Sequence, residues 1–89
     1  MAHSVSARKR IRQNQRRRAR NIWRLRRMRV AIKDFEKALA GDDIAAATET
    51  YKNAAAIIDK TAQKGCIHRN QAARRKSRLN ARLKAKATA

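Results

Sequence analysis

The 89-residue sequence contains no proline and only two glycines, Gly41 and Gly65. Because these two residue types interrupt helices most strongly, long helices can form between them. Aromatic residues make up only 3% of the chain, and no segment shows the alternation of apolar and polar residues that strands require. Runs rich in Ala, Arg and Lys favour helix instead. The sequence therefore predicts an all-α protein whose helices are separated at the two glycines.

Cysteine and long apolar runs are also scarce. Cys66 is the only cysteine, so the chain has no disulfide framework. No stretch approaches the roughly 18 apolar residues of a membrane span. Cys66 and His68 lie close together in sequence, but a zinc site needs a second pair of ligands. We therefore expect no metal, no cofactor and no association with a membrane.

Acidic residues are few and are confined to the middle of the chain. Six Asp and Glu oppose 25 Lys and Arg, which gives a net charge of +19. Residues 1–33 carry 13 cations and residues 66–89 carry 8, and neither segment contains an acid. Charge of this size opposes a compact state and attracts polyanions. Arginine outnumbers lysine in both segments and suits bidentate phosphate binding, so the pattern predicts a nucleic-acid-binding protein.

The six acids do not form a catalytic pattern. They lie on or beside the middle segment, where they suit helix caps, helix dipoles and surface charges; they are Asp34, Glu36, Asp42, Asp43, Glu49 and Asp59. The sequence also lacks a Gly-rich phosphate loop and a nucleophile–base pattern. We therefore expect neither enzymatic activity nor a small-molecule substrate.

Hydrophobic periodicity predicts helices over about 6–40, 43–64 and 68–84. The second half of the first helix carries an apolar seam with spacings of three and four, made of Ile22, Leu25, Met28, Ile32, Phe35 and Leu39. Its first half is basic on every side and should project from the bundle. Short connections make neighbouring helices antiparallel. The expected architecture is a single domain, residues 1–89, formed by an antiparallel three-helix bundle with a long, basic N-terminal first helix.

Residues at the expected helix ends support these boundaries. Ser4 or Ser6 suits the start of the first helix, and Asp42 or Asp43 suits the start of the second. A glycine directly after a helix commonly adopts positive φ. We therefore expect Gly41 to end the first helix in that conformation, and Gly65 to stop the second helix.

Several other functions fit parts of the pattern. A basic stretch followed by an apolar seam resembles a leucine-zipper DNA-binding protein, but the seam covers fewer than three heptads. A membrane-surface helix would need an apolar face opposite its charges. A mitochondrial transit peptide would be richer in Ser than this N-terminus. A DNA architectural protein remains the main alternative, and Trp23 could either pack at the bundle edge or stack on a base.

Three stretches of the sequence resemble a known family. They read KGCIHRNQAARRKSRL at Lys64–Leu79, SARKRIRQNQRRRARN at Ser6–Asn21, and AIKDFEKALAGDD at Ala31–Asp43. These motifs are similar to those of the twentieth protein of the bacterial small ribosomal subunit, the S-twenty family. Similarity covers essentially the whole chain, and the C-terminal motif is the most specific. Cys66 departs from the family, which usually has an aliphatic residue there.

The resemblance implies a structural constituent of the small (30S) ribosomal subunit that binds 16S ribosomal RNA directly and stabilises its folding and packing. It implies a cytoplasmic location on the ribosome and few or no protein contacts. The family's RNA contacts carry over to Lys9, Arg10, Arg12, Arg16, Arg17, Arg20, Asn21, His68, Asn70, Arg74, Arg75, Lys76, Ser77 and Arg78. We add Ser6, Arg8, Arg24, Arg27 and Arg82, which lie along the same two basic segments.

Overall fold

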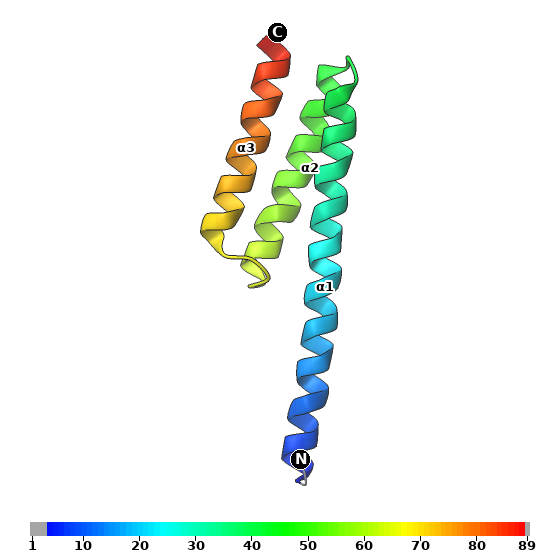
Figure 1. Ribbon diagram of the computed structural model, residues 1–89, viewed down its shortest axis with the longest axis vertical. Coiled ribbons are helices and arrows are strands. Elements are labelled where there is room, and N and C mark those ends of the chain that lie inside the picture. The colour runs from blue at the N-terminus through cyan, green and yellow to red at the C-terminus, as the bar shows by residue number, and fades with distance from the viewer. Residues whose placement is uncertain (1–3, 89) are drawn as a thin grey trace.

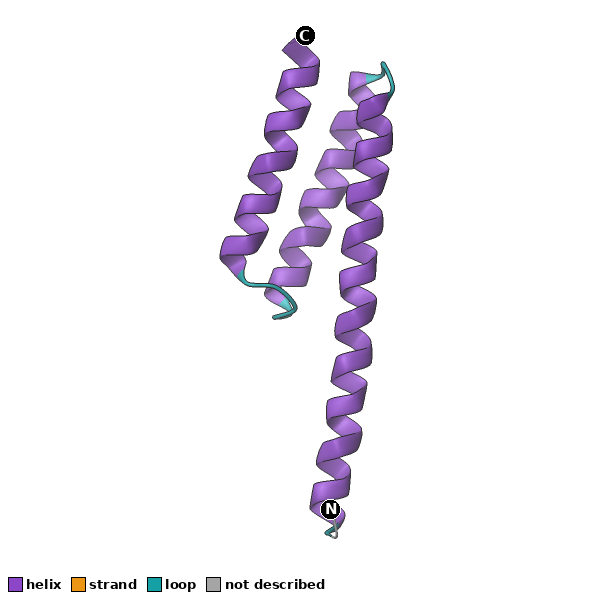
Figure 2. Ribbon diagram, in the orientation of Figure 1, coloured by secondary structure: helices purple, strands orange, loops and turns teal. Residues whose placement is uncertain are grey.

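The computed structural model describes residues 4–88 and consists of three helices joined by two short connections (Figure 2). Helix α1 spans Val5–Ala40, α2 spans Ile44–Gln63 and α3 spans Arg69–Thr88. No strand occurs within the described range. Helix α1 runs the length of the molecule, whereas α2 and α3 lie beside its C-terminal half only (Figure 1). The predicted antiparallel three-helix architecture with a long first helix is confirmed.

Side-chain caps define the starts of the first two helices. The Ser4 hydroxyl oxygen accepts a hydrogen bond from the Ala7 N–H at 3.1 Å. The Asp43 carboxylate accepts one from the Ala46 N–H at 3.2 Å. Each cap satisfies a backbone donor that has no partner within its own helix. Of the two candidates predicted at each start, Ser4 and Asp43 are therefore the capping residues.

The end of α2 follows the expected glycine rule. Gly65 has a φ of +79°, a conformation that glycine adopts without a steric penalty. The Gly65 N–H donates to the Ala62 carbonyl at 2.9 Å, and the Cys66 N–H donates to the Thr61 carbonyl at 3.1 Å. This pair of bonds is a Schellman motif, which satisfies the last carbonyls of the helix.

The prediction of positive φ at Gly41 is wrong. Gly41 has φ −79° and ψ 175°, which is extended backbone that other residues also adopt. The connection to α2 contains only three residues, 41–43. It leaves α1 directly through extended backbone, so no left-handed residue is needed to reverse the chain.

Helix α3 is longer than its predicted end near Lys84. His68 precedes the helix, and its ring nitrogen Nδ1 accepts a hydrogen bond from the Asn70 N–H at 3.1 Å. At the other end the helix continues to Thr88. The added residues are Ala85, Lys86, Ala87 and Thr88. Ala and Lys are among the strongest helix formers, so propensity extends α3 beyond its apolar edge.

The core is thin because alanines make up half of it. The buried apolar residues are Met28, Ala31, Phe35, Ala47, Ala54, Ile58, Ala72 and Leu79. Only four of them have large side chains. Phe35 is completely buried and meets Tyr51 edge-on, with ring centroids 5.9 Å apart at an angle of 63°. This aromatic pair joins α1 to α2, and the loss of either ring would remove a large share of the buried surface.

The predicted apolar seam of α1 enters the core except at its first residue. Met28 and Phe35 are buried, and the seam residues beside them pack partly buried against the core. Ile22 is instead 41% exposed, so the seam extends one residue beyond the core. Figure 1 shows that α2 ends and α3 begins near the middle of α1, so the N-terminal half of α1 has no neighbouring helix.

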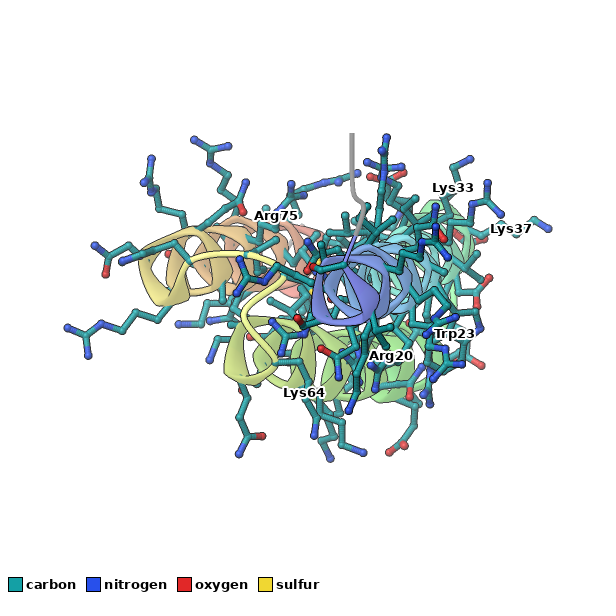
Figure 3. All side chains as sticks on the ribbon, turned by 90° about the horizontal axis from the view of Figure 1, so that it is seen from below. Arg20, Trp23, Lys33, Lys37, Lys64 and Arg75 are labelled. Atoms are coloured by element: carbon teal, nitrogen blue, oxygen red, sulfur yellow. The ribbon has the colours of Figure 1, made fainter. Side chains whose placement is uncertain are left out.

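Helix α2 packs against both other helices, whereas α1 and α3 approach each other much less closely. Side chains bridge the wider gap. The Arg82 guanidinium donates to the Glu36 carboxylate at 3.2 Å and thereby joins α3 to α1. Figure 3, seen from the N-terminal end, shows α2 below the other two helices and Arg75 where α3 faces α1.

Candidate nucleic-acid interface

The N-terminal half of α1 projects beyond the other helices (Figure 1). We name residues 5–20 the basic arm. At 1.5 Å per residue the arm is about 24 Å long, and the whole molecule measures 63 Å along its longest axis. The arm carries eight cations and no acid. All the site residues predicted here are exposed, namely Ser6, Arg8, Lys9, Arg10, Arg12, Arg16, Arg17 and Arg20.

The charges of the basic arm have no internal counter-charge. The ion pairs found in residues 4–88 join Lys52 to Glu49, Lys76 to Asp59 and Arg82 to Glu36, and none of them involves the arm. A helix that is charged on every side cannot bury a face against protein. The arm is therefore a helix that exposes guanidinium and ammonium groups on every side, a shape and charge suited to a polyanion.

A cationic cluster lies where the basic arm joins the bundle. Its members line one depression on the surface and come from α1 and from the end of α2; they are Arg17, Arg20, Asn21, Arg24 and Lys64. Figure 3 shows Arg20 on the side of α1 that faces α2, and Lys64 at the near end of α2. We call this set the junction cluster. Four of its five members are predicted site residues, namely Arg17, Arg20, Asn21 and Arg24.

Two features of the junction cluster were not predicted from the sequence. Lys64 is not among the predicted site residues, but the α1–α2 hairpin places it beside Arg20 and Arg24. The Cys66 thiol donates to the Asn21 side-chain oxygen at 3.3 Å. This bond fixes the loop before α3 to α1 and orients Asn21. The antiparallel pairing of the first two helices was the one signal that could have located Lys64.

The start of α3 carries a second group of predicted residues. His68, Gln71, Arg74, Arg75 and Arg78 line another surface depression, and Asn70 and Ser77 are exposed on the same helix. Arg75 is half-buried, and its Nε atom is buried without a hydrogen-bond partner. Packing of its stem, rather than an ion pair, therefore holds the Arg75 side chain.

Two predicted residues of α3 are paired with carboxylates of the same chain. The Lys76 ammonium lies 2.8 Å from the Asp59 carboxylate on α2. The Arg82 guanidinium lies 3.2 Å from the Glu36 carboxylate on α1. Both pairs are substantially exposed, and exposed pairs contribute about 0–1 kcal/mol. These two cations therefore contribute little to the docking of α3, but part of their charge is already neutralised.

The acids gather away from the basic arm. Five of the six lie in the last two turns of α1, the α1–α2 connection or the first turns of α2; they are Asp34, Glu36, Asp42, Asp43 and Glu49. The molecule is consequently strongly polarised along its length. A bound polyanion is favoured at the arm, the junction cluster and the start of α3, and is disfavoured at the α1–α2 turn.

In the described part of the chain, no three His, Cys, Asp or Glu side chains gather to hold a metal ion. None of its helices is long and apolar enough to cross a membrane.

Comparisons with known proteins give a consistent result. The family model described as ribosomal protein S20 matches residues 2–84. A small ribosomal subunit protein bS20 of Gluconobacter oxydans is 52% identical over 89 residues, which cover 100% of both chains. The bS20 protein of Acinetobacter baumannii is 52% identical over 85 residues, or 96% of this chain and 97% of the relative. That of Psychrobacter cryohalolentis is 46% identical over 84 residues, or 94% and 96%.

Proposed function

Because the chain belongs to the ribosomal protein S20 family, we propose that it binds 16S ribosomal RNA directly, through phosphate contacts of the basic arm, the junction cluster and the start of α3. Membership of this family makes it a structural constituent of the small ribosomal subunit and not an enzyme, in agreement with the sequence prediction.

The observation that supports direct RNA binding best is the basic arm. Eight cations project on one exposed helix, and no carboxylate of the described residues pairs with them. In A-form RNA the major groove is deep and narrow, so a basic helix contacts phosphates, 2′-hydroxyls and overall shape rather than base edges. Each phosphate that a cation neutralises releases a condensed counterion, which favours binding.

In the proposed mechanism the bundle positions the RNA-binding segments, and the cations provide the affinity for RNA. The bundle sets the angle between the arm and α3. The Cys66–Asn21 hydrogen bond links the loop before α3 to the residue of α1 that follows the arm. The cations then neutralise phosphates where RNA segments converge, which lowers the repulsion that opposes RNA packing. Lys76 and Arg82 join this surface by exchanging a carboxylate for a phosphate.

We further propose that the chain acts as one RNA-binding domain on the cytoplasmic ribosome, with few or no protein contacts. The exposed large apolar residues are spread along the length of α1, with cations between most of them in sequence; they are Val5, Ile11, Ile22, Trp23 and Val30. A stable protein–protein interface usually has a contiguous apolar centre. Nucleic acid is therefore the partner that this surface favours.

The leucine-zipper alternative is disfavoured by the packing of α1. A zipper needs its apolar seam free to meet a second copy of the chain. In this fold Met28 and Phe35 are fully buried within a single copy. DNA binding by the same cations, as in an architectural protein, is the alternative that an experiment must separate.

Competition binding tests the proposed function. A labelled, folded 16S ribosomal RNA is bound to the full chain and challenged with unlabelled 16S ribosomal RNA or duplex DNA at matched salt. The RNA competitor is expected to act at concentrations at least about tenfold lower, because non-specific binding to a duplex rests on charge alone. Equal competition by duplex DNA would contradict the proposal.

A further inference from the structure

Trp23 is the only tryptophan of the chain, and 58% of its surface is exposed. The other two aromatic residues are less exposed: Phe35 is buried, and Tyr51 packs partly buried against the core. A single exposed aliphatic residue is ordinary on a protein surface. An indole is the largest apolar side chain. Packing at the bundle edge, one of the two alternatives for Trp23, buries less than half of its surface.

The Trp23 ring borders a shallow pocket between α1 and the C-terminal part of α2. Ile57 and Thr61 of α2 contribute to its lining. The Thr61 hydroxyl donates to the Ile57 carbonyl at 2.7 Å, so its proton is already used within the helix. The lining next to the indole therefore offers mainly apolar surface, which suits a flat, uncharged ring.

Cations surround this pocket. Four of them line it, namely Arg24, Arg27, Lys60 and Lys64, and no acid does. The Arg27 guanidinium lies 5.6 Å from the centre of the indole ring. Both the indole and the planar guanidinium stack well on nucleobases. The rim thus offers positive charge close to an aromatic stacking surface.

The pocket adjoins the junction cluster. Arg24 and Lys64 line both depressions. Figure 3 shows Trp23 and Arg20 on the same side of α1, toward α2. A nucleotide chain that follows phosphate contacts along the arm would therefore reach the indole without leaving the cationic surface.

We propose that Trp23 is the stacking platform for one unstacked RNA base, whose flanking phosphates are held by Arg24, Lys60 and Lys64. This inference rests on the proposed function and adds to it a contact with a base. It differs from the remaining contacts because it requires an unpaired nucleotide, whereas the arm binds phosphates of any duplex or loop.

The size and charge of the pocket favour a nucleobase over a protein side chain. Its volume is about 220 Å³, below the roughly 300–1,000 Å³ of sites that enclose drug-sized ligands. It therefore suits one ring system rather than a whole nucleotide. A protein partner would have to bring several carboxylates to match the four cations of the rim, whereas each nucleotide brings a phosphate beside its base.

The single indole allows a direct test by intrinsic fluorescence. The full chain is titrated at one salt concentration with folded 16S ribosomal RNA and, separately, with a blunt RNA duplex that contains no unpaired base. Stacking should quench Trp23 emission with folded 16S ribosomal RNA and leave it largely unquenched when the duplex binds. Gel-shift titrations of the same mixtures establish that each RNA is bound.

Variants at two exposed positions of α1 complete the test. Trp23→Ala should weaken binding to folded 16S ribosomal RNA by about 5- to 150-fold, the range for loss of one base–aromatic stack. Trp23→Phe should recover most of that loss because it restores a stacking ring. Val30→Ala is the control, since Val30 is 57% exposed, and should bind like the wild-type chain. Circular dichroism confirms that each variant keeps its helices.

The possible results separate this inference from the proposed function. Failure of the wild-type chain to bind folded 16S ribosomal RNA would overturn both. Tight binding with unquenched emission, and with Trp23→Ala equal to wild type, would overturn the stacking inference alone. A change in emission only after other small-subunit proteins are added would also overturn it, because a protein would then cover the indole.

Discussion

Replacing Arg12, Arg16 and Arg17 together by Gln is expected to weaken the affinity of the chain for folded 16S ribosomal RNA by about two orders of magnitude. All three side chains are exposed on the basic arm and lack an ion-pair partner among the described residues. An exposed charge–phosphate contact contributes up to about 1 kcal/mol, and about 1.4 kcal/mol corresponds to a tenfold change in Kd. Filter binding at fixed salt measures the loss.

A second triple variant controls for net charge. Arg26, Arg29 and Lys33 are also exposed on α1. They lie on the half of α1 that packs in the bundle, and they are not among the predicted interface residues. Their replacement by Gln removes the same number of positive charges and should weaken RNA binding only a few-fold. That is roughly the effect expected when only the long-range attraction between the protein and the RNA is reduced, since salt screens it. Equal losses from the two triple variants would show that binding follows total charge rather than the arm.

Phe35→Ala is expected to destabilise the free chain by about 3–5 kcal/mol, the usual cost of removing a fully buried aromatic side chain. Phe35 is 0% exposed, and only three other large side chains share the core with it. A chain of 89 residues has a total free energy of unfolding of about 4–13 kcal/mol. Urea unfolding followed by circular dichroism should therefore show a midpoint shifted strongly toward lower urea, because the loss is a large share of the total free energy of unfolding.

Two comparisons make the Phe35 result specific. Val30→Ala changes an exposed residue of the same helix and should alter the free energy of unfolding by no more than about 0.5 kcal/mol. Folded 16S ribosomal RNA should recover helical structure in the Phe35→Ala chain, because a ligand that binds only the folded state stabilises it. A loss below about 1 kcal/mol for Phe35→Ala would contradict the assignment of Phe35 to the centre of the core.

The helices were predictable because their signals are local. The spacing of apolar residues from Leu25 to Leu39 reports one face of a helix, and it agrees with the burial of Met28 and Phe35. The exposure of Ile22, the first residue of the seam, has a non-local cause. Periodicity alone does not reveal where the partner helices end, and Ile22 lies at that boundary.

The helix ends also depend partly on local residue types and partly on the chain that follows them. Gly65 adopts the positive φ expected of a glycine after a helix, whereas Gly41 does not. The difference comes from how much chain remains before the next helix, which a single residue type does not encode. At the end of α3, alanine and lysine propensity outweighed the lack of an apolar edge beyond Leu83.

The basic arm was predictable from charge, but the surroundings of Trp23 were not. Eight cations without an acid indicate an exposed polyanion-binding segment in the sequence alone. The pocket beside Trp23 requires Lys60 and Lys64, which lie about 40 residues away along the chain. Only the folded α1–α2 hairpin brings them to Trp23.

The dependence of RNA affinity on salt concentration tests the central claim most directly. If about eight cations of the wild-type chain neutralise RNA phosphates, a plot of log K against log salt for folded 16S ribosomal RNA should fall with a slope of about −7. A slope near zero would mean that the exposed cations do not carry the affinity, and the proposed mode of binding would then be wrong.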